Sequence, residues 1–365
     1  MAVSIVFVRE SAQGERRIAL TPETAKKMMV LGARIVIERG AGIPAHFRDE
    51  AYIGAEFTDT ADAALAGADV LVCVQPPENA RLARLKPGAV VVGLLAPHAD
   101  PGRIDALVSA RLTGFSLERL PRTTRAQAMD VLSSQAGMAG YKAVLIAAQL
   151  APRYFPMLTT AAGTIRPSKV LIVGAGVAGL QAIATARRLG AQVEGFDVRP
   201  ETREQIESLG GKFLDLGVSA AGEGGYAREL TTDERAEQQK RLAEHLKTVD
   251  VIVTTAAVPG RPAPRIITAA MVAGMKPGSV IVDLAAETGG NCELTRPGET
   301  IDSNGVTVAG PLNLASQGAL HASEMYARNV FNFLALSLKD GRLSLDWNDE
   351  LITRTCLAHA GEPKA

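Results

Sequence analysis

A glycine-rich turn that follows a strand-like run is the feature of this sequence whose residue types and spacing most directly indicate chemistry. We find the apolar run Lys169–Val173, then Gly174, Gly176 and Gly179 before a helical pattern. In such a turn the first glycine permits a tight bend, the second lets backbone approach a pyrophosphate, and the third lets the helix pack on the strand. The first N–H groups of the helix attract phosphate. The pattern therefore predicts a dinucleotide site, with a purely structural glycine turn as the alternative.

Asp197 indicates which dinucleotide binds. It lies 18 residues after Gly179, at the end of a second predicted strand over 192–196. A carboxylate there can accept hydrogen bonds from the adenosine ribose. Because its charge repels a 2′-phosphate, the sequence favours NAD(H) over NADP(H).

Strand-length apolar runs alternate with helical patterns, which is typical of parallel α/β architecture. The predicted strands are 4–8, 34–38, 70–74, 90–94 and 113–116, and later 170–173, 193–196, 251–254, 280–284 and 306–308. Helices are predicted over 138–150 and 319–338, the latter followed by a polar tail. For 365 residues we expect two Rossmann-like, doubly wound domains, separated by a cleft and joined by long helices. The first domain would comprise residues 1–136 plus 318–365, and the NAD-binding domain residues 137–317.

The two halves of the chain also resemble each other in sequence. The interval from Gly190 to Asp250 is about 23 residues longer than its counterpart from Gly32 to Asp69, with the extra residues near 217–240. That segment is glycine-rich, so it predicts a lid over the cofactor, or alternatively a surface excursion without a role.

The first half lacks the glycine turn. It has Phe7-Val-Arg9-Glu10 at the matching place, and these side chains would obstruct a pyrophosphate. We therefore expect one cofactor per chain.

The bulk composition excludes several classes of protein. Lys plus Arg (39) equals Asp plus Glu (39), so no charge excess favours nucleic acid or an anionic membrane. No apolar run approaches the ~18 residues that span a bilayer, and we expect a soluble, cytoplasmic protein. Three widely spaced cysteines and five scattered histidines predict neither disulfides nor a metal site. His98, beside a proline, is interpreted as a loop residue rather than a base.

A polar segment after the last strand of the first half is a second candidate site. It contains Arg122, Gln127, Asp130 and Ser133. These groups suit holding a carboxamide, ribose or pyrophosphate at the interdomain cleft, but not proton abstraction at neutral pH. The alternative is a solvated turn and helix cap, with Ser133 or Ser134 as N-cap.

These residues resemble those of the NAD(H)-binding components of proton-translocating NAD(P) transhydrogenases, which form one family with the alanine dehydrogenases. The shared segments are 16–23, 40–42, 74–76, 122–135, 173–181, 197–199, 224–227, 276–283 and 289–292. Alanine dehydrogenases carry a catalytic lysine where this chain has Gln75, and their catalytic histidine falls at Ala96. The transhydrogenase components instead share a hallmark loop with Arg122, Gln127 and Asp130.

The resemblance also implies roles for individual residues. Gln127, Arg122 and Asp130 would be the catalytic residues, with Gln127 orienting the nicotinamide and the other two fixing the loop. The implied cofactor-binding residues are Arg122, Gln127, Asp130, Ser133, Gly174, Gly176, Val177, Gly179, Asp197, Val198, Arg199, Gly225, Tyr226, Gln238 and Ala257. Arg17 matches a substrate-binding arginine of alanine dehydrogenases, but is interpreted here as a structural ion-pair partner.

The activity that the resemblance implies is hydride transfer between NAD(H) on this chain and NADP(H) on a partner subunit. Such a transfer leaves no proton to manage at the reacting carbons, which agrees with the missing acid–base pair. The chain would be a homodimer, held at the inner face of the cell membrane by NADP(H)-binding and membrane-spanning subunits. The alternatives are an alanine dehydrogenase-like enzyme and a non-catalytic NAD-binding protein.

Overall fold

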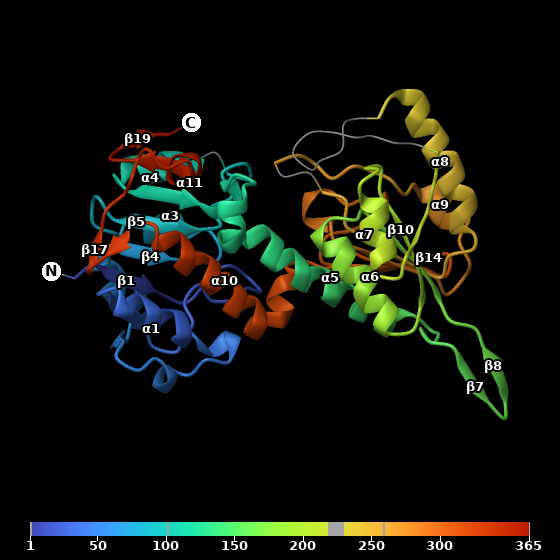
Figure 1. Cartoon of the computed structure of the whole chain (residues 1–365), viewed down its shortest axis with the longest axis horizontal. Helices are drawn as coiled ribbons and strands as arrows, with labels where there is room; N and C mark the ends of the chain where they lie inside the picture. Colours follow the sequence, from blue (N-terminus) through green and yellow to red (C-terminus); the bar gives the residue numbers. More distant parts are fainter. Residues whose placement is uncertain (1, 101, 218–229, 258–259, 365) are drawn as a thin grey trace. The chain divides into compact units, whose positions relative to one another are not determined.

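The computed structural model describes residues 2–100, 102–217, 230–257 and 260–364, which divide into two compact units (Figure 1). Unit 1 comprises Met1–Gln135 and Ala315–Ala365, and unit 2 comprises Ala136–Leu314. Helix α5 (Val131–Leu150) contributes residues to both units. Every strand predicted from the sequence is present, and no strand boundary differs by more than about two residues.

Unit 1 is built on a sheet with the strand order β19-β18-β6-β5-β4-β1-β2-β3. Its strands are β1 (Ser4–Phe7), β2 (Arg34–Glu38), β3 (Glu56–Thr58), β4 (Val70–Val72), β5 (Val90–Gly93), β6 (Thr113–Ser116), β18 (Cys356–His359) and β19 (Glu362–Pro363). The strands from β3 to β6 are parallel, whereas β18 and β19 pair antiparallel. The parallel portion has the order of a Rossmann fold, which confirms the predicted fold class.

Both faces of the unit 1 sheet are covered because its strands are nearly continuous apolar runs. Ile5 and Phe7 of β1 point to one face, and Val6 points to the other. The first face packs against α1 (Pro22–Val30), α10 (Ala319–Leu334) and α11 (Glu350–Thr355). The second packs against α2 (Ala61–Ala66), α3 (Asn79–Leu82) and α4 (Gly102–Ser109).

Unit 2 repeats this plan with the strand order β11-β10-β9-β12-β13-β15-β14. Its strands are β9 (Lys169–Val173), β10 (Gln192–Phe196), β11 (Lys212–Phe213), β12 (Val251–Thr254), β13 (Val280–Asp283), β14 (Thr300–Ser303) and β15 (Val306–Ala309). Helices α5, α6 (Val177–Arg188) and α7 (Thr202–Ser208) cover one face, and α8 (Thr232–Leu246) and α9 (Ala269–Ala273) cover the other. Only β14 runs antiparallel among the described strands of this sheet.

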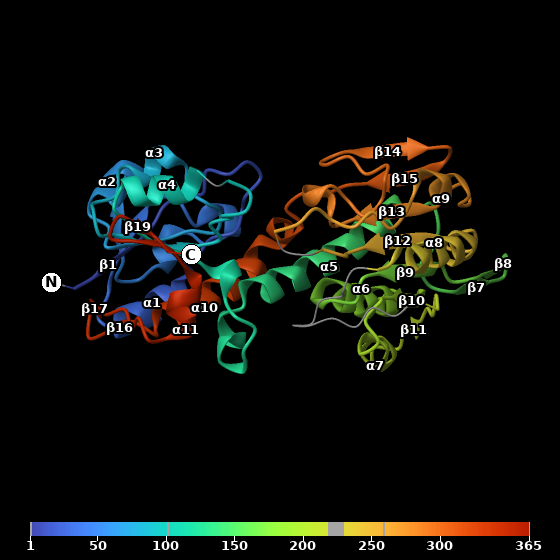
Figure 2. The same cartoon turned by 90° about the horizontal axis from the view of Figure 1, so that it is seen from above.

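Smaller elements complete the two units. They are the 3₁₀ helices η1 (Ile43–Ala45), η2 (Asp49–Ala51), η3 (Leu117–Arg119), η4 (Thr124–Met129), η5 (Ala286–Thr288) and η6 (Leu314–Gly318), and the strand pairs β7 (Leu158–Thr160) with β8 (Gly163–Ile165) and β16 (Leu338–Lys339) with β17 (Arg342–Leu343). The β7–β8 hairpin projects from the body of unit 2 (Figures 1 and 2). Met157, which directly precedes the hairpin, and Ile165, the last residue of β8, are 64% and 45% exposed.

Two predictions for the helices and the tail are wrong in ways that matter for the site. Helix α5 begins at Val131, seven residues before the predicted start, so the polar segment leads directly into it. The chain after α10 is not a polar tail, because Leu351, Ile352 and Leu357 are buried and β18 extends the sheet. None of the helices among the described residues combines the length and apolarity that crossing a bilayer requires.

Candidate functional site

The predicted glycine turn lies between the end of β9 and the start of α6. Gly174 adopts a φ of +93°, and a Cβ on it would lie 2.7 Å from Thr255 Oγ1. A Cβ on Gly179 would lie 1.8 Å from the Gly174 carbonyl oxygen, so any side chain there would separate α6 from the turn. A Cβ on Gly176 would meet nothing within 4 Å. The turn is therefore packed tightly at its first and third glycines and open at the second.

The N-terminus of α6 faces this open position without a side-chain cap. Gly176 is the N-cap residue and supplies no side-chain acceptor to the first turn. A helix start of this kind presents N–H groups and the positive end of the helix dipole to an anion. Helix α5 packs closely against it, because a Cβ on Gly140 would lie 2.0 Å from the Ala178 carbonyl oxygen.

Asp197 follows β10 and is tied directly to the turn. One carboxylate oxygen accepts the Ala175 N–H at 2.7 Å and the Arg199 Nη2 donor at 2.8 Å. The other accepts the backbone N–H and the Nε of Arg199, at 2.9 and 3.0 Å. The carboxylate is buried, and both of its oxygens are engaged.

The other residues of unit 2 that are predicted to bind the cofactor differ in location and exposure. Val177 is 46% exposed on the first turn of α6, and Val198 lies half-buried between Asp197 and Arg199. Gln238 is buried on α8, and Ala257 is exposed after β12. Gly225 and Tyr226, the predicted lid residues, lie outside the described residues. The glycines and residues 197–199 thus come together at the carboxyl ends of β9 and β10.

Sequence reasoning assigns no role to two residues that hold this edge of the sheet. Thr255 donates through Oγ1 to the Gly174 carbonyl oxygen at 3.0 Å. Asn291 is fully buried, donates to the carbonyl oxygens of Ala256 and Pro264, and accepts the Ala256 N–H. The motif Gly289–Cys292 is a signal for Asn291, but only its contacts across the fold show what the amide does.

The polar segment of unit 1 forms η4 and a helix cap. Asp130 accepts the Ser133 N–H at 2.9 Å and the Ser133 hydroxyl at 2.6 Å, ahead of α5. The alternative interpretation, with Ser133 or Ser134 as N-cap, is wrong about the cap residue, because the longer helix places both serines inside its first turn. The hydroxyl of Ser134 instead donates to Asn329 Oδ1 at 2.7 Å.

The loop over residues 122–130 is anchored to unit 1 through some of its side chains, while two of its predicted site residues are exposed. Arg125 forms an ion pair with Asp349, the N-cap residue of α11. Ala126 and Met129 are buried in the unit 1 core. Arg122 and Gln127, in contrast, are exposed. An exposed amide on a fixed backbone can bind an external carboxamide at low cost in ordering.

Arg17 is buried in an ion pair, not open to a substrate. Its Nη2 lies 2.7 Å from Glu15 Oε2, its Nε donates to Oε1 at 2.9 Å, and its Nη1 donates to Gln135 at 3.0 Å. Gln75 donates to the same carboxylate at 2.9 Å. Burial by itself raises the pKa of Glu15, but the hydrogen bonds and charge of Arg17 outweigh it and lower the pKa to about 2.

Glu10 fills the position in unit 1 that Gly176 leaves open in unit 2. Both residues stand three places after the last residue of the central strand, β1 or β9. The Glu10 carboxylate accepts the N–H groups of Val74 and Gln75, at 2.6 and 3.1 Å. Burial raises the pKa of Glu10 to about 7. Unit 1 thus has a buried glutamate side chain at the place where unit 2 has open space beside a glycine.

His98 and the three cysteines differ in exposure. His98 is exposed in a turn after β5. Cys73, Cys292 and Cys356 are free and buried. No group of His, Cys, Asp and Glu side chains within the described ranges is arranged to hold a metal ion.

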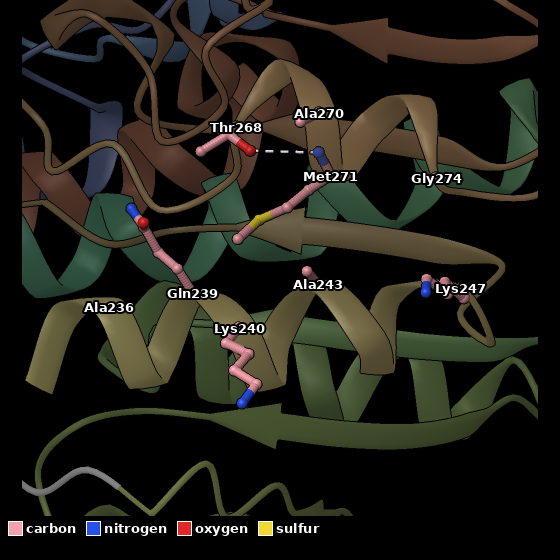
Figure 3. Close-up of a pocket in the computed structure, with 9 residues that line it drawn as sticks. All are labelled: Ala236, Gln239, Lys240, Ala243, Lys247, Thr268, Ala270, Met271 and Gly274. Atoms are coloured by element: carbon pink, nitrogen blue, oxygen red, sulfur yellow. Dashed lines mark hydrogen bonds between the residues drawn. The ribbon is translucent and has the colours of Figure 1, made fainter.

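A groove of about 410 Å³ lies between α8 and α9 (Figure 3). Small and apolar side chains such as Ala243 and Met271 line it, and Lys240 points away from α9. Thr268 caps α9 by accepting the Met271 N–H at 3.2 Å. None of the residues predicted to bind NAD(H) lines this groove, so we do not assign it to the dinucleotide.

Comparison with known families covers almost the whole chain. The N-terminal domain model of the family described as alanine dehydrogenase/PNT matches residues 6–139, and its C-terminal domain model matches residues 143–364. The second match includes α10, although α10 packs into unit 1.

Individual relatives are similar over nearly their full length. The chain is 44% identical to a Rhodospirillum rubrum protein, the first of the parts that make up its NAD(P) transhydrogenase subunit alpha, over 98% of this chain and 97% of that protein. The counterpart in Rickettsia prowazekii is 42% identical, over 99% and 96%. The crystal structure of transhydrogenase from Sinorhizobium meliloti superposes with a TM-score of 0.87 at 41% identity, over 99% and 98% of the two chains. An L-alanine dehydrogenase superposes with a TM-score of 0.81 at 24% identity over 99% and 96% of the two chains, which shows a shared fold.

Proposed function

Because this chain belongs to the alanine dehydrogenase/PNT family of oxidoreductases, we propose that it is a transhydrogenase subunit that binds NAD(H) and exchanges hydride with NADP(H) on a partner subunit. The observation that carries the proposal is the loop over residues 122–130. Its backbone is fixed on unit 1, while the amide of Gln127 faces outward. A residue placed in this way can act on a group that another polypeptide also contacts.

The residues of unit 2 fit NAD(H). Gly176 leaves open space beside an uncapped helix start, which suits a pyrophosphate. Asp197 stands at the end of the neighbouring strand, where the adenosine ribose of a dinucleotide lies in Rossmann folds. We assign Val177 to the phosphate turn, Val198 and Arg199 to the ribose end, and Gln238 and Ala257 to further lining positions.

Positioning is the main task of the chain in this reaction. The nicotinamide supplies a hydride at its ring, so no side chain needs to move a proton at the reacting carbons. Gln127 would orient the carboxamide, and Arg122 would contact the same end of the dinucleotide. Asp130 holds Ser133 and the start of α5, so its role is to fix the loop. Orientation of two reactants alone contributes up to roughly 7–11 kcal/mol in favourable intramolecular cases.

Gln75 supports hydride exchange over amino-acid dehydrogenation. It stands where alanine dehydrogenases carry the catalytic lysine, and its amide donates to Glu15 in the buried ion pair. It offers no amine that could act as acid or base. The guanidinium of Arg17 is already paired with Glu15 inside the fold, so it is not open to the carboxylate of an amino-acid substrate.

The proposed assembly has three components. Two copies of this chain form a homodimer, for which the β7–β8 hairpin and the exposed side chains of Tyr154, Met157 and Ile165 offer a surface. A second subunit holds NADP(H), and a membrane-spanning subunit couples hydride transfer to proton movement. In this arrangement the chain lies at the inner face of the cell membrane.

The test is reduction of an absorbance-shifted NAD analogue by NADPH. We expect turnover when the purified chain is mixed with an NADP(H)-binding transhydrogenase subunit, and none with either protein alone. Oxidation of alanine with NAD⁺ by the purified chain, without a partner, would contradict the proposal. NADH binding without any hydride exchange in the mixture would reduce the chain to a binding protein.

A further inference from the structure

Two amide side chains of α10 converge on one carbonyl of η4. Asn329 Nδ2 and Asn332 Nδ2 each lie 2.9 Å from the carbonyl oxygen of Ala128. The two asparagines are three residues apart, so they project from the same face of the helix. Ala128 directly follows Gln127, the residue that the proposed function assigns to the nicotinamide.

The chemistry of the turn explains why this carbonyl needs such partners. The last carbonyls of a helical turn have no donor within it. The Gln127 carbonyl oxygen accepts the Asp130 N–H at 3.3 Å, but the Ala128 carbonyl oxygen is directed to α10. A carbonyl oxygen has two lone pairs, and the two amides match them.

Asn329 extends the connection to the start of α5. Its Oδ1 accepts the hydroxyl of Ser134 at 2.7 Å, so one buried amide joins η4, α5 and α10. Asn332 is only partly buried and makes the second bond from the helix surface. The backbone around Gln127 is therefore fixed in two ways. The Ala128 carbonyl is hydrogen-bonded to α10, and the side chains of Ala126 and Met129 are buried in the core.

We infer that Asn329 and Asn332 are positioning residues for hydride transfer, which act by fixing the Ala128 carbonyl and so the orientation of Gln127. The inference rests on the proposed function of Gln127. It predicts an effect on the chemical step that exceeds the effect on dinucleotide affinity, because the glycine turn and Asp197 are untouched.

The test is a double-mutant cycle between Asn332 and Gln127 in the reconstituted hydride-transfer assay. We expect Asn332→Ala to lower kcat about tenfold while the Kd for NADH changes less than about twofold. Asn332→Asp keeps the shape but sets a carboxylate against the carbonyl, so its loss of kcat is larger. In the Gln127→Ala background, Asn332→Ala then changes kcat by less than about twofold, since the two residues act as one unit.

Arg328→Ala is the matched control. Arg328 is exposed on the same helix, and its guanidinium donates to Glu23 at 2.8 Å, away from η4. We expect its kcat to equal that of the unsubstituted chain. An undiminished effect of Asn332→Ala in the Gln127→Ala background, or none in either background, overturns the inference and leaves the role of Gln127 intact. If Gln127→Ala alone leaves kcat unchanged, both the proposed role of Gln127 and the inference fail.

Discussion

Asp197 and Arg199 form a bidentate ion pair at the carboxyl end of β10. The guanidinium donates to both carboxylate oxygens, at 3.0 and 2.8 Å, and the Ala175 N–H of the glycine turn donates to one of them. The carboxylate that should select NAD(H) is thus already partnered by a cation. Removal of either residue exposes the charge of the other.

The first prediction concerns cofactor choice. Asp197→Asn removes the negative charge and one of the two acceptor oxygens, and it leaves the Arg199 cation beside the ribose, where it can pair with a 2′-phosphate. We expect NADH to bind about tenfold more weakly and NADPH to bind more tightly than before. Fluorescence titration with both nucleotides measures the ratio of the affinities for NADH and NADPH. In Asp197→Asn with Arg199→Leu the gain for NADPH should vanish, and an unchanged NADH-to-NADPH ratio in the single variant would refute the assignment.

The second prediction uses two glycines of α5 as a matched pair. Gly140→Ala places a methyl group 2.0 Å from the Ala178 carbonyl oxygen, so it must displace the first turn of α6. Gly137→Ala meets nothing within 4 Å and favours the helix by roughly 0.5–1 kcal/mol. We expect Gly140→Ala to weaken NADH binding at least tenfold and Gly137→Ala to leave it unchanged. Equal affinities of the two variants in calorimetric titration would show that α5 does not support the anion-binding helix start.

The third prediction is acid sensitivity through Glu15. The pKa of Glu15 lies near 2 in the folded chain and near 4.5 when unpaired, because the contacts with Arg17 outweigh burial. The folded state therefore binds fewer protons than the unfolded state between these values, and stability falls as pH drops from 4.5 towards 2. The loss amounts to about 3 kcal/mol for this buried pair. Urea unfolding should show a smaller pH dependence for Glu15→Gln in this window, and an identical slope would argue against the ion pair.

The fourth prediction concerns Glu10, whose contribution to stability decreases as pH rises, opposite to that of Glu15. Burial raises its pKa from 4.5 to about 7, so the folded state binds more protons than the unfolded state in this interval. Stability contributed by protonated Glu10 is complete below pH 4.5 and is lost as pH rises towards 7. In Glu10→Gln this decline should be absent. The test is the midpoint of denaturant unfolding at pH 5, 6, 7 and 8 for the unsubstituted protein and for Glu10→Gln. If the midpoint falls equally with pH in both proteins, another group titrates.

Local patterns account for the regions of the molecule that are predictable from the sequence. The glycine spacing at 174, 176 and 179 and the apolar runs β9 and β10 are short-range features, and each specifies its own conformation. Strand β18 carries no such pattern in four residues. It forms because it pairs with β6 far earlier in the chain, so composition alone suggests a tail.

The candidate site likewise has a part that is predictable from the sequence and a part that is not. The motif around Gln127 is visible as a polar segment, but the contacts of Asn332 and Asn329 with Ala128 link residues about 200 positions apart. No periodicity encodes such a contact, because amide side chains bond wherever the tertiary fold brings them to an acceptor. The bonds from Ser133 to Asp130 escape the sequence pattern for a related reason, since the cap depends on where the helix begins.

The last prediction transfers the carboxylate of unit 1 into unit 2. Glu10 and Gly176 occupy matching places, and Glu10 binds backbone N–H groups that follow the neighbouring strand. Gly176 has a φ of −76° and open space around its Cβ, so Gly176→Glu should fold normally. Its charge would stand at the helix start that the pyrophosphate requires, and we expect NADH binding to fall by more than about 100-fold with an unchanged melting temperature. Gly176→Gln has the same size without the charge and should lose less. If both variants bind NADH as tightly as the unsubstituted chain, the phosphates do not lie at Gly176, and the assignment of the glycine turn to the pyrophosphate is wrong.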